Sequence, residues 1–176
     1  MQVITTGGTI DKIYFDTLDG FEASDPQAPQ IFKTADVGFQ YNVLPLLKKD
    51  SLVLEEKDRA LIKQKVESSP SDKILITHGT DTMDQTGKFL LDKSNEASVS
   101  NKTIVLVGAM QPAALSKTDA VFNLGFAACA LLTLPPGVYI TMNGQIFDPR
   151  NVVKNRSASR FEHSIPQHDT SDTGKS

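Results

Sequence analysis

Short runs of β-branched and aliphatic residues, separated by segments of helical periodicity, are the feature that most constrains the fold of this 176-residue chain. Residues Lys73 to Thr77, Thr103 to Gly108 and Val138 to Met142 are such runs, and each one predicts a strand. The longest helix-compatible segment, Ser116 to Leu132, is rich in Ala and Leu and stands between the last two runs. Strands that alternate with helices predict an α/β domain with a mostly parallel sheet.

Several shorter segments extend this pattern. A strand is predicted at Val3 to Thr6, and the alternation of polar and apolar residues from Phe39 to Val43 predicts a half-buried strand. Residues Glu55 to Val66 carry apolar side chains at helical spacing. The dipeptide Asn143-Gly144 favours a tight hairpin turn, with Ile146-Phe147 as the returning arm.

Two segments lack any such pattern. Residues Asp16 to Thr34 contain two prolines, a glycine and several acids, and the length of this stretch predicts an irregular lid loop. From Glu162 onward the chain is polar and unpatterned. We therefore expect one domain over residues 1–161, followed by a flexible tail over residues 162–176.

Composition narrows the classes of partner. The chain has 18 Lys plus Arg against 21 Asp plus Glu, and this slight acidity without a basic run argues against nucleic acid as a partner. The longest apolar stretch, Phe126 to Leu134, is too short to span a bilayer, and Met1 leads directly into a strand-like run. We expect a cytoplasmic protein with no membrane partner.

The single Cys129 is expected to pack in the core, as are Phe122 and Phe126. Neither HExxH nor CxxC is present, so we expect no metal and no cofactor.

Two hydroxyl-rich loops follow predicted strands, at Thr5 to Thr9 and at Thr77 to Thr82. Each combines glycine with Thr hydroxyls, which donate or accept hydrogen bonds and attack a carbonyl once deprotonated. Ligands of open α/β sheets bind beyond the carboxyl ends of the strands, where these loops are expected. Taken alone, each loop is equally well explained as a tight turn with local hydrogen bonds. Their joint occurrence favours a functional site.

As a pair, these loops resemble the signature of the bacterial-type L-asparaginases, in Thr6-Gly7-Gly8-Thr9-Ile10 and in Ile76-Thr77-His78-Gly79-Thr80-Asp81-Thr82-Met83. Later segments resemble the same family in the same order, at Val107 to Pro112, Phe122 to Leu124 and Asp148 to Lys154. The resemblance extends from the N-terminus to about Phe161. It implies a single-domain, three-layer α/β sandwich of flavodoxin-like or Rossmann-like type, as in the N-terminal domain of these enzymes.

The resemblance also implies an activity, the hydrolysis of L-asparagine to L-aspartate and ammonia through a threonine nucleophile. Thr9 matches that nucleophile, and Tyr14 is the nearest candidate for the tyrosine that the family keeps on a mobile loop downstream. Thr80, Asp81 and Lys154 match a second group. In this group the lysine supports a hydroxyl near the scissile amide, and the aspartate holds the ammonium of the substrate.

The resemblance further implies a substrate-binding set, with Ser51 as a ligand of the substrate carboxylate and with Gly8, Asp50, Gly79 and Ala109. Leu52 departs from the family, which usually has Gln there, so one hydrogen bond to the α-amino group is missing. Long relatives also have a second domain that completes the site of a neighbouring subunit. We therefore expect a homo-oligomer that closes the site with its own surfaces, and a substrate range that includes glutamine or other small amides.

The chemistry of this residue set follows from general principles. An alcohol is a weak nucleophile at neutral pH, and general-base catalysis typically contributes about 10² to 10⁴ in rate. A lysine beside an acid serves as the base if burial lowers its pKa from about 10.4 toward neutrality, and Lys154 lies in a matching segment. Backbone N–H groups after Gly8 and Gly79 are candidate oxyanion donors. His78 is expected to orient a loop.

Two other classes of function remain open. A flavodoxin-like module would use Thr6 to Thr9 as a cradle for phosphate or FMN, although neither GxxxxGK[ST] nor GxGxxG is present. A yellow purified protein would favour it. A catalytically weak amino-acid sensor would keep the asparagine pocket without turnover, and the Leu52 departure is compatible with it. Ligand binding without ammonia release would favour the sensor.

Overall fold

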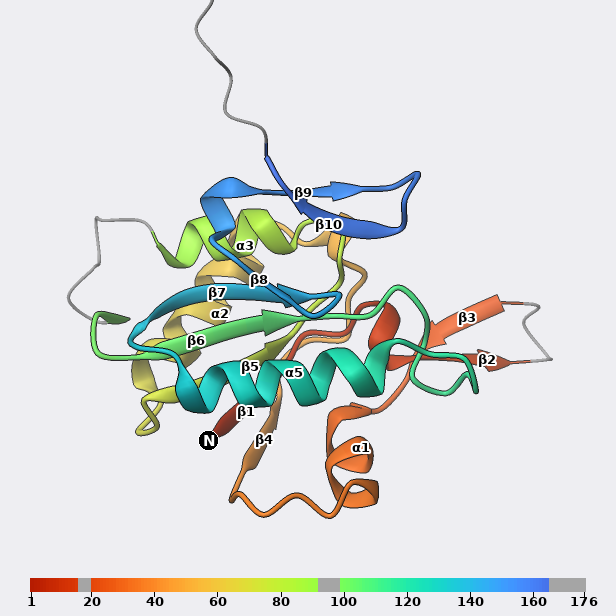
Figure 1. Cartoon of the computed structure of the whole chain (residues 1–176), viewed down its shortest axis with the longest axis horizontal. Helices are drawn as coiled ribbons and strands as arrows, with labels where there is room; N and C mark the ends of the chain where they lie inside the picture. The colour runs from red at the N-terminus through yellow and green to blue at the C-terminus, as the bar shows by residue number, and fades with distance from the viewer. Residues whose placement is uncertain (16–19, 92–98, 165–176) are drawn as a thin grey trace, which may run out of the picture.

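A six-stranded sheet forms the centre of the molecule (Figure 1). The computed structural model describes residues 1–15, 20–91 and 99–164. The strand order is β4-β1-β5-β6-β7-β8, in which the first five strands are parallel and β8 runs antiparallel to β7. These strands are β1 (Gln2–Thr5), β4 (Asn42–Pro45), β5 (Lys73–Thr77), β6 (Thr103–Val107), β7 (Gly137–Met142) and β8 (Gln145–Phe147). The mostly parallel sheet confirms the expected fold class.

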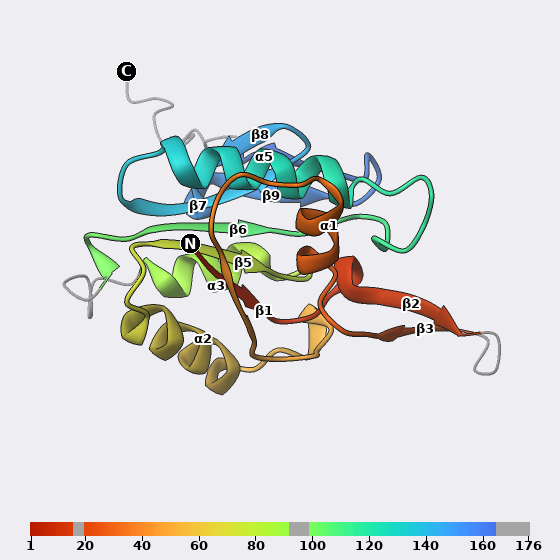
Figure 2. The same cartoon turned by 90° about the horizontal axis from the view of Figure 1, so that it is seen from below.

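Helices cover both faces of the sheet and give the molecule three layers (Figure 2). One face carries α1 (Ala28–Thr34) and α5 (Ala120–Thr133), and the other carries α2 (Glu56–Ser68) and α3 (Met83–Leu90). A small hairpin of β9 (Val152–Asn155) and β10 (Arg160–His163) packs on the α2 and α3 side through two buried residues, Val152 and Phe161. The three-layer arrangement confirms the predicted sandwich.

The central strands divide their side chains between two cores. Ile74 and Ile76 of β5 belong to the core under α2 and α3, whereas Leu75 belongs to the core under α1 and α5. In β6, Leu106 and Val105 divide in the same way. All five are completely buried. Burial on both faces explains why these strands are continuous apolar runs in the sequence.

The segment expected to be an irregular lid is mostly regular, so that prediction is wrong for its described residues. After residues 16–19, which lie outside the description, β3 (Gly20–Ala23) pairs with β2 (Lys12–Phe15), and α1 follows. Phe32 of α1 is buried. Pro29 stands in the first turn of α1, where a proline has no helical hydrogen bond to lose. The prolines therefore mark the start of a helix.

Other boundaries also differ from expectation. The strand predicted from Phe39 begins at Asn42, because the rings of Phe39 and Tyr41 pack on Phe32 instead. Glu162 and His163, which were expected in the tail, belong to β10, and the ring of His163 lies 4.8 Å from that of Phe147. Residues 165–176 lie outside the description.

The predicted hairpin turn at Asn143-Gly144 is confirmed. It joins β7 to β8, and both residues have positive φ, 54° for Asn143 and 73° for Gly144. A two-residue hairpin turn of this kind requires positive φ at both central positions, and Asn-Gly meets that requirement at the smallest steric cost.

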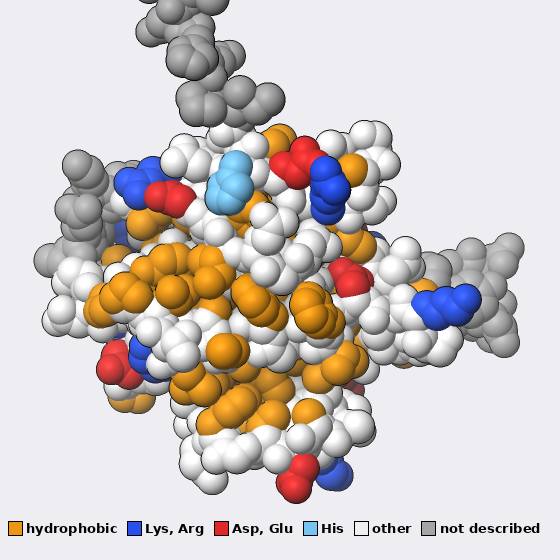
Figure 3. Space-filling model, in the orientation of Figure 1, with side chains coloured by type: hydrophobic (Ala, Val, Ile, Leu, Met, Phe, Trp, Pro, Cys, Tyr) orange, Lys and Arg blue, Asp and Glu red, His pale blue; other side chains and the backbone are white. Residues whose placement is uncertain are grey.

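Helix α5 exposes apolar side chains, contrary to expectation. Phe122 is 61 % exposed and Cys129 is exposed, so the prediction that both pack in the core is wrong, while Phe126 is half-buried. Figure 3 shows hydrophobic side chains across this side of the molecule. A groove of about 400 Å³ between α1 and α5 is lined mostly by aliphatic and aromatic residues. None of the described helices is long and apolar enough to cross a membrane.

Candidate active site

The two threonine loops begin at neighbouring strand ends. Strand β1 lies between β4 and β5, and all three run in the same direction, so their carboxyl ends share one edge of the sheet. The short helical turn η1 (Thr9–Asp11) follows β1 closely, and Thr77 is the last residue of β5. Strand order reverses at this point of the sheet, and open α/β sheets bind ligands at such a position.

Glycines bring three loops into close contact. A Cβ atom at Gly8 would lie 2.5 Å from the Cα of Gly79, and one at Gly79 would lie 2.6 Å from Ser51 Oγ. Gly8 also has φ 87° and ψ −174°, a conformation that is essentially restricted to glycine. The contact places Thr9, which is half-buried and directly follows Gly8, beside the second threonine loop.

Lys154 joins the second threonine loop to the β9–β10 hairpin. Its Nζ donates hydrogen bonds to Thr80 Oγ1 at 2.7 Å and to Asp81 Oδ1 at 2.9 Å. The side chains of Lys154 and Asp81 are each 19 % exposed. Thr80 is almost completely buried. The structure thus brings together three residues that the resemblance had grouped.

Ser51 lies under the same loop. Its hydroxyl accepts a hydrogen bond from the Asp81 N–H at 3.2 Å, and its carbonyl accepts one from Thr82 Oγ1 at 2.8 Å. The residue is almost completely buried in the turn η2 (Ser51–Val53). Ser51 therefore helps to fix the position of Asp81 through the backbone of this loop.

Asp50 stands at the start of η2 and is paired with a lysine. Its Oδ2 lies 2.8 Å from Lys12 Nζ, and its Oδ1 accepts a hydrogen bond from the Leu52 N–H at 3.0 Å. These contacts, led by the one with Lys12, lower the pKa of Asp50, and the charge of Lys154 acts in the same direction. Asp50 is therefore a charged neighbour of the Lys154 group.

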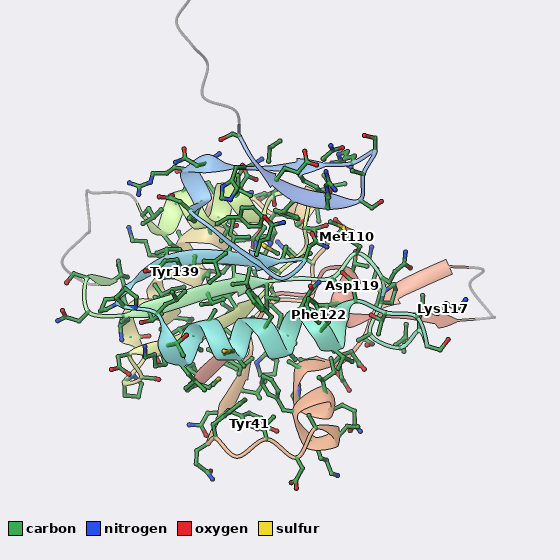
Figure 4. The ribbon with its side chains drawn as sticks, in the orientation of Figure 1. Tyr41, Met110, Lys117, Asp119, Phe122 and Tyr139 are labelled. Atoms are coloured by element: carbon green, nitrogen blue, oxygen red, sulfur yellow. The ribbon has the colours of Figure 1, made fainter. Side chains whose placement is uncertain are left out.

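The loop after β6 packs against the first threonine loop. Ala109 is completely buried beside Ile10, the residue after Thr9. Asp119, at the start of α5, holds this loop by accepting hydrogen bonds from the Met110 N–H at 2.9 and 3.0 Å (Figure 4). The methyl group of Ala109 belongs to the core, which leaves only its backbone to face a ligand.

His78 is completely buried and neutral. Its Nδ1 lies 2.7 Å from the Gly79 carbonyl, and its Nε2 lies 2.8 Å from Thr86 Oγ1. A carbonyl only accepts hydrogen bonds, so Nδ1 carries the hydrogen and Nε2 accepts from the Thr86 hydroxyl. Burial lowers the pKa of His78 to about 4. The contacts agree with the expected role of orienting the loop.

Two charged residues of this region were missed in the sequence. Asp11 is almost completely buried, and burial raises its pKa from 3.8 to about 6 against the effect of a hydrogen bond from the Gln27 N–H. Arg156 Nη2 lies 2.7 Å from Asp81 Oδ1. No motif marks either residue, because both contacts depend on the folded arrangement of separate loops.

The remaining predictions for the site concern Tyr14 and metal binding. Tyr14 belongs to β2 and pairs with Phe21, but its side chain lies outside the described part of the structure. Within residues 1–15, 20–91 and 99–164, no group of three or more His, Cys, Asp or Glu is placed to hold a metal ion.

Comparisons with known proteins give a consistent result. Residues 1–169 match the family described as asparaginase, N-terminal. The chain is 31 % identical over 170 residues to the glutaminase-asparaginase of Acinetobacter glutaminasificans, an alignment that covers 86 % of this chain and 48 % of that protein. It therefore spans about half the length of this curated relative.

Solved structures show the same relationship. The thermostable L-asparaginase from Thermococcus kodakarensis superposes with a TM-score of 0.75 at 27 % identity, over 92 % of this chain and 50 % of that chain. A probable cytoplasmic L-asparaginase from Campylobacter jejuni superposes with a TM-score of 0.70 at 28 % identity and the same coverage. Since the family match extends over nearly the whole sequence, the chain belongs to the asparaginase family. It corresponds to the N-terminal domain of that family.

Proposed function

We propose that this protein is an amidohydrolase that releases ammonia from L-asparagine, with L-glutamine as a second substrate. One observation carries the proposal: Lys154 Nζ hydrogen-bonds to Thr80 Oγ1 and Asp81 Oδ1 beside the point where Gly8 meets Gly79. This arrangement sets a lysine and two threonine loops around one small region. Family membership supports the reaction class and argues against the flavodoxin-like alternative.

In this proposal Thr9 is the nucleophile. Its Oγ1 forms a bond to the carboxamide carbon, and its hydroxyl proton passes to a neighbouring base. The C–N bond then breaks, the nitrogen leaves with a proton as ammonia, and water hydrolyses the ester on Thr9 to give the free acid. Thr9 Oγ1 makes no hydrogen bond to any residue that the structure describes, so its lone pairs are available for attack.

The Thr80 group assists the proton transfers. Because Thr80 Oγ1 accepts a hydrogen bond from Lys154, its own hydrogen is directed elsewhere and can be donated to the leaving nitrogen. The oxygen Oγ1 is then left with a negative charge, which the positive charge of Lys154 stabilises. A proton from the water that hydrolyses the ester restores the Thr80 hydroxyl. The backbone N–H groups of Thr9 and Thr80 are the proposed oxyanion donors, a role often worth about 3 to 4 kcal/mol per donor.

Recognition of the rest of the substrate is assigned to the neighbouring loops. We assign the substrate carboxylate to Ser51, with Asp50, Gly8, Gly79 and the backbone of Ala109 as the surrounding contacts. The ammonium of the substrate is assigned to Asp81. Tyr14 completes the proposed catalytic set from the β2–β3 hairpin.

Ammonia release tests the reaction directly. The purified protein is incubated with L-asparagine, L-glutamine and simple amides such as propionamide, and ammonia is measured over time. We expect turnover of L-asparagine and L-glutamine, and slower turnover of amides that lack a carboxylate. Binding of L-asparagine by calorimetry without ammonia release after long incubation would contradict the hydrolase and identify a sensor.

Assembly and location are also part of the proposal. A homo-oligomer is supported by the exposed apolar side chains of α5, among them Val121 at 54 %, Phe122 at 61 % and Leu132 at 49 %. Light scattering is expected to give a multiple of 19.1 kDa, and a monomer with full activity would contradict it. A cytoplasmic location is supported by the Campylobacter jejuni neighbour and is tested by cell fractionation.

A further inference from the structure

Arg156 lies at the outer side of the candidate active site, in the turn between β9 and β10. Its Nη2 is 2.7 Å from Asp81 Oδ1, the same oxygen that accepts a hydrogen bond from Lys154 Nζ at 2.9 Å. The Arg156 side chain is 68 % exposed, against 19 % for Asp81. One carboxylate oxygen is therefore held by two cations, an inner one and an outer one.

This arrangement leaves the cluster of Lys154, Asp81 and Arg156 with an excess of positive charge. The nearby Lys12–Asp50 pair is balanced, but Asp81 balances only one of the two cations beside it. A substrate ammonium that approaches Asp81 is repelled by Arg156, whereas a substrate carboxylate is attracted. The guanidinium carries five N–H donors in a planar fork that matches a carboxylate, more than one oxygen of Asp81 can accept.

Leu52 points to the same selectivity by an independent observation. It follows Ser51 directly, and its side chain is 63 % exposed. An aliphatic side chain offers neither a donor nor an acceptor to an ammonium. An ammonium at this site therefore finds no polar partner in the Leu52 side chain and meets a second cation, Arg156, beside Asp81.

The Arg156–Asp81 ion pair is also easily exchanged. Ion pairs with one partner this exposed contribute little to stability, because water screens the attraction and a long side chain loses rotamer freedom. Arg156 can therefore leave Asp81 for a ligand carboxylate with little loss. Its contribution is expected in ligand selection, and its effect on the stability of the fold is expected to be small.

We propose that Arg156 is a specificity-determining residue that extends the substrate range of the site to carboxamides whose only charge is a carboxylate. These substrates are the monoamides of short dicarboxylic acids. The inference rests on the amidohydrolase function proposed above. Succinamate is the simplest probe, since it keeps the carboxamide and carboxylate of asparagine and lacks the ammonium.

The test compares the variant Arg156→Gln with Arg160→Gln as a matched control. Arg160 lies on the same hairpin, is 59 % exposed and pairs with Glu162 at 2.6 Å. Ammonia release gives kcat/KM for succinamate and for L-asparagine. We expect Arg156→Gln to lower the ratio of succinamate to asparagine by about tenfold, the factor of one charge-assisted hydrogen bond, and Arg160→Gln to leave it unchanged. An unchanged ratio in Arg156→Gln would overturn the proposal.

A binding experiment separates this inference from the proposed reaction. Calorimetry with succinate and L-aspartate needs no turnover and gives the ratio of their dissociation constants. If the wild-type protein releases no ammonia, the amidohydrolase is refuted, and Arg156 is still judged by whether Arg156→Gln weakens succinate relative to L-aspartate. Failure of the wild-type protein to bind either acid, or an equal effect of Arg156→Gln on both, would refute the role of Arg156.

Discussion

Two lysine–threonine pairs stand at opposite ends of the sheet. At the amino end, Lys73 Nζ donates to Thr103 Oγ1 at 3.0 Å and to the Leu134 carbonyl at 3.1 Å. At the carboxyl end, Lys154 Nζ donates to Thr80 Oγ1 at 2.7 Å and to Asp81. The two lysines therefore make nearly the same contact with a threonine hydroxyl.

Their surroundings differ. Lys73 and Thr103 are register partners on neighbouring strands, and the Leu134 carbonyl ends α5, where a positive charge is favourable. Lys154 has a carboxylate as its second acceptor and lies near glycines that bring two loops into contact. The first pair closes the end of a helix and the second faces a candidate site. A lysine–threonine hydrogen bond alone does not indicate catalysis.

The largest contrast is expected in activity. Lys154→Met is expected to lower kcat/KM for L-asparagine by about 10³-fold, the middle of the range for general acid–base catalysis. Lys73→Met, the matched control at the amino end, is expected to leave kcat/KM unchanged. Ammonia release by the two variants measures the contrast, and similar losses in both would remove the distinction between the two ends.

Two glycines are expected to differ in their effect on stability. Gly8→Ala is expected to lower the free energy of unfolding by about 3 kcal/mol, because Ala is strained at this φ and ψ and its Cβ would meet the Gly79 backbone. Gly125→Ala is the control in α5, where a Cβ meets nothing within 4 Å, and it is expected to raise stability by about 0.5 to 1 kcal/mol. Urea unfolding measures both, and a neutral Gly8→Ala would show that the loops are not tightly joined.

Asp11 gives the carboxyl end a pH dependence. Its folded pKa of about 6 exceeds the ordinary 3.8, so the folded protein binds the proton more tightly and its stability falls as pH rises from about 4 to 6. Asp11→Asn keeps the acceptor for the Gln27 N–H and removes the buried charge. Relative to the wild-type protein, the variant is expected to gain roughly 2 to 3 kcal/mol between pH 4 and pH 7.

The measurement is urea unfolding of both proteins at a series of pH values. His78 acts with the opposite sign. Its pKa is lowered from 6.5 to about 4, so its contribution to stability rises as pH increases from about 4 to 6.5. The difference between the variant and the wild-type protein cancels this contribution. A difference that does not change with pH would show that the carboxylate of Asp11 has an ordinary pKa.

The smallest contrast is expected in the stability of the two lysine variants. Lys73→Met removes two hydrogen bonds, but Thr103 Oγ1 still donates to the Leu134 carbonyl at 3.3 Å. The expected loss is about 1 to 2 kcal/mol in the free energy of unfolding. Lys154→Met is expected to lose less, and thermal unfolding of the two variants compares them. A larger loss in Lys154→Met would assign that lysine a mainly structural role.

The elements that were predicted correctly depend on burial or on turn stereochemistry. Strand β5 has the bounds read from its apolar run, and the Asn143-Gly144 turn follows from the need for positive φ. Helix α1 was missed because its prolines were interpreted as loop signals, although Pro29 fits a first turn. A local sequence pattern predicts the structure correctly where burial or backbone stereochemistry permits only one conformation.

The contacts of the site were less predictable. The family resemblance alone grouped Lys154 with Thr80 and Asp81. Lys154 is more than seventy residues away from the other two in the sequence, and nothing in that spacing indicates contact. Arg156 and Asp11 were missed for the same reason. A side chain that reaches another loop leaves no periodic signal in the sequence, and only the packed arrangement of strand ends reveals it.

The central claim is that the hydroxyl of Thr9 attacks a substrate carboxamide. The most direct measurement is ammonia release from L-asparagine by Thr9→Ala, with Thr133→Ala as a control at the exposed end of α5. We expect Thr9→Ala to retain the circular dichroism and unfolding midpoint of the wild-type protein and to lose ammonia release, while Thr133→Ala keeps it. Turnover by Thr9→Ala close to that of the wild-type protein would show that Thr9 is not the nucleophile.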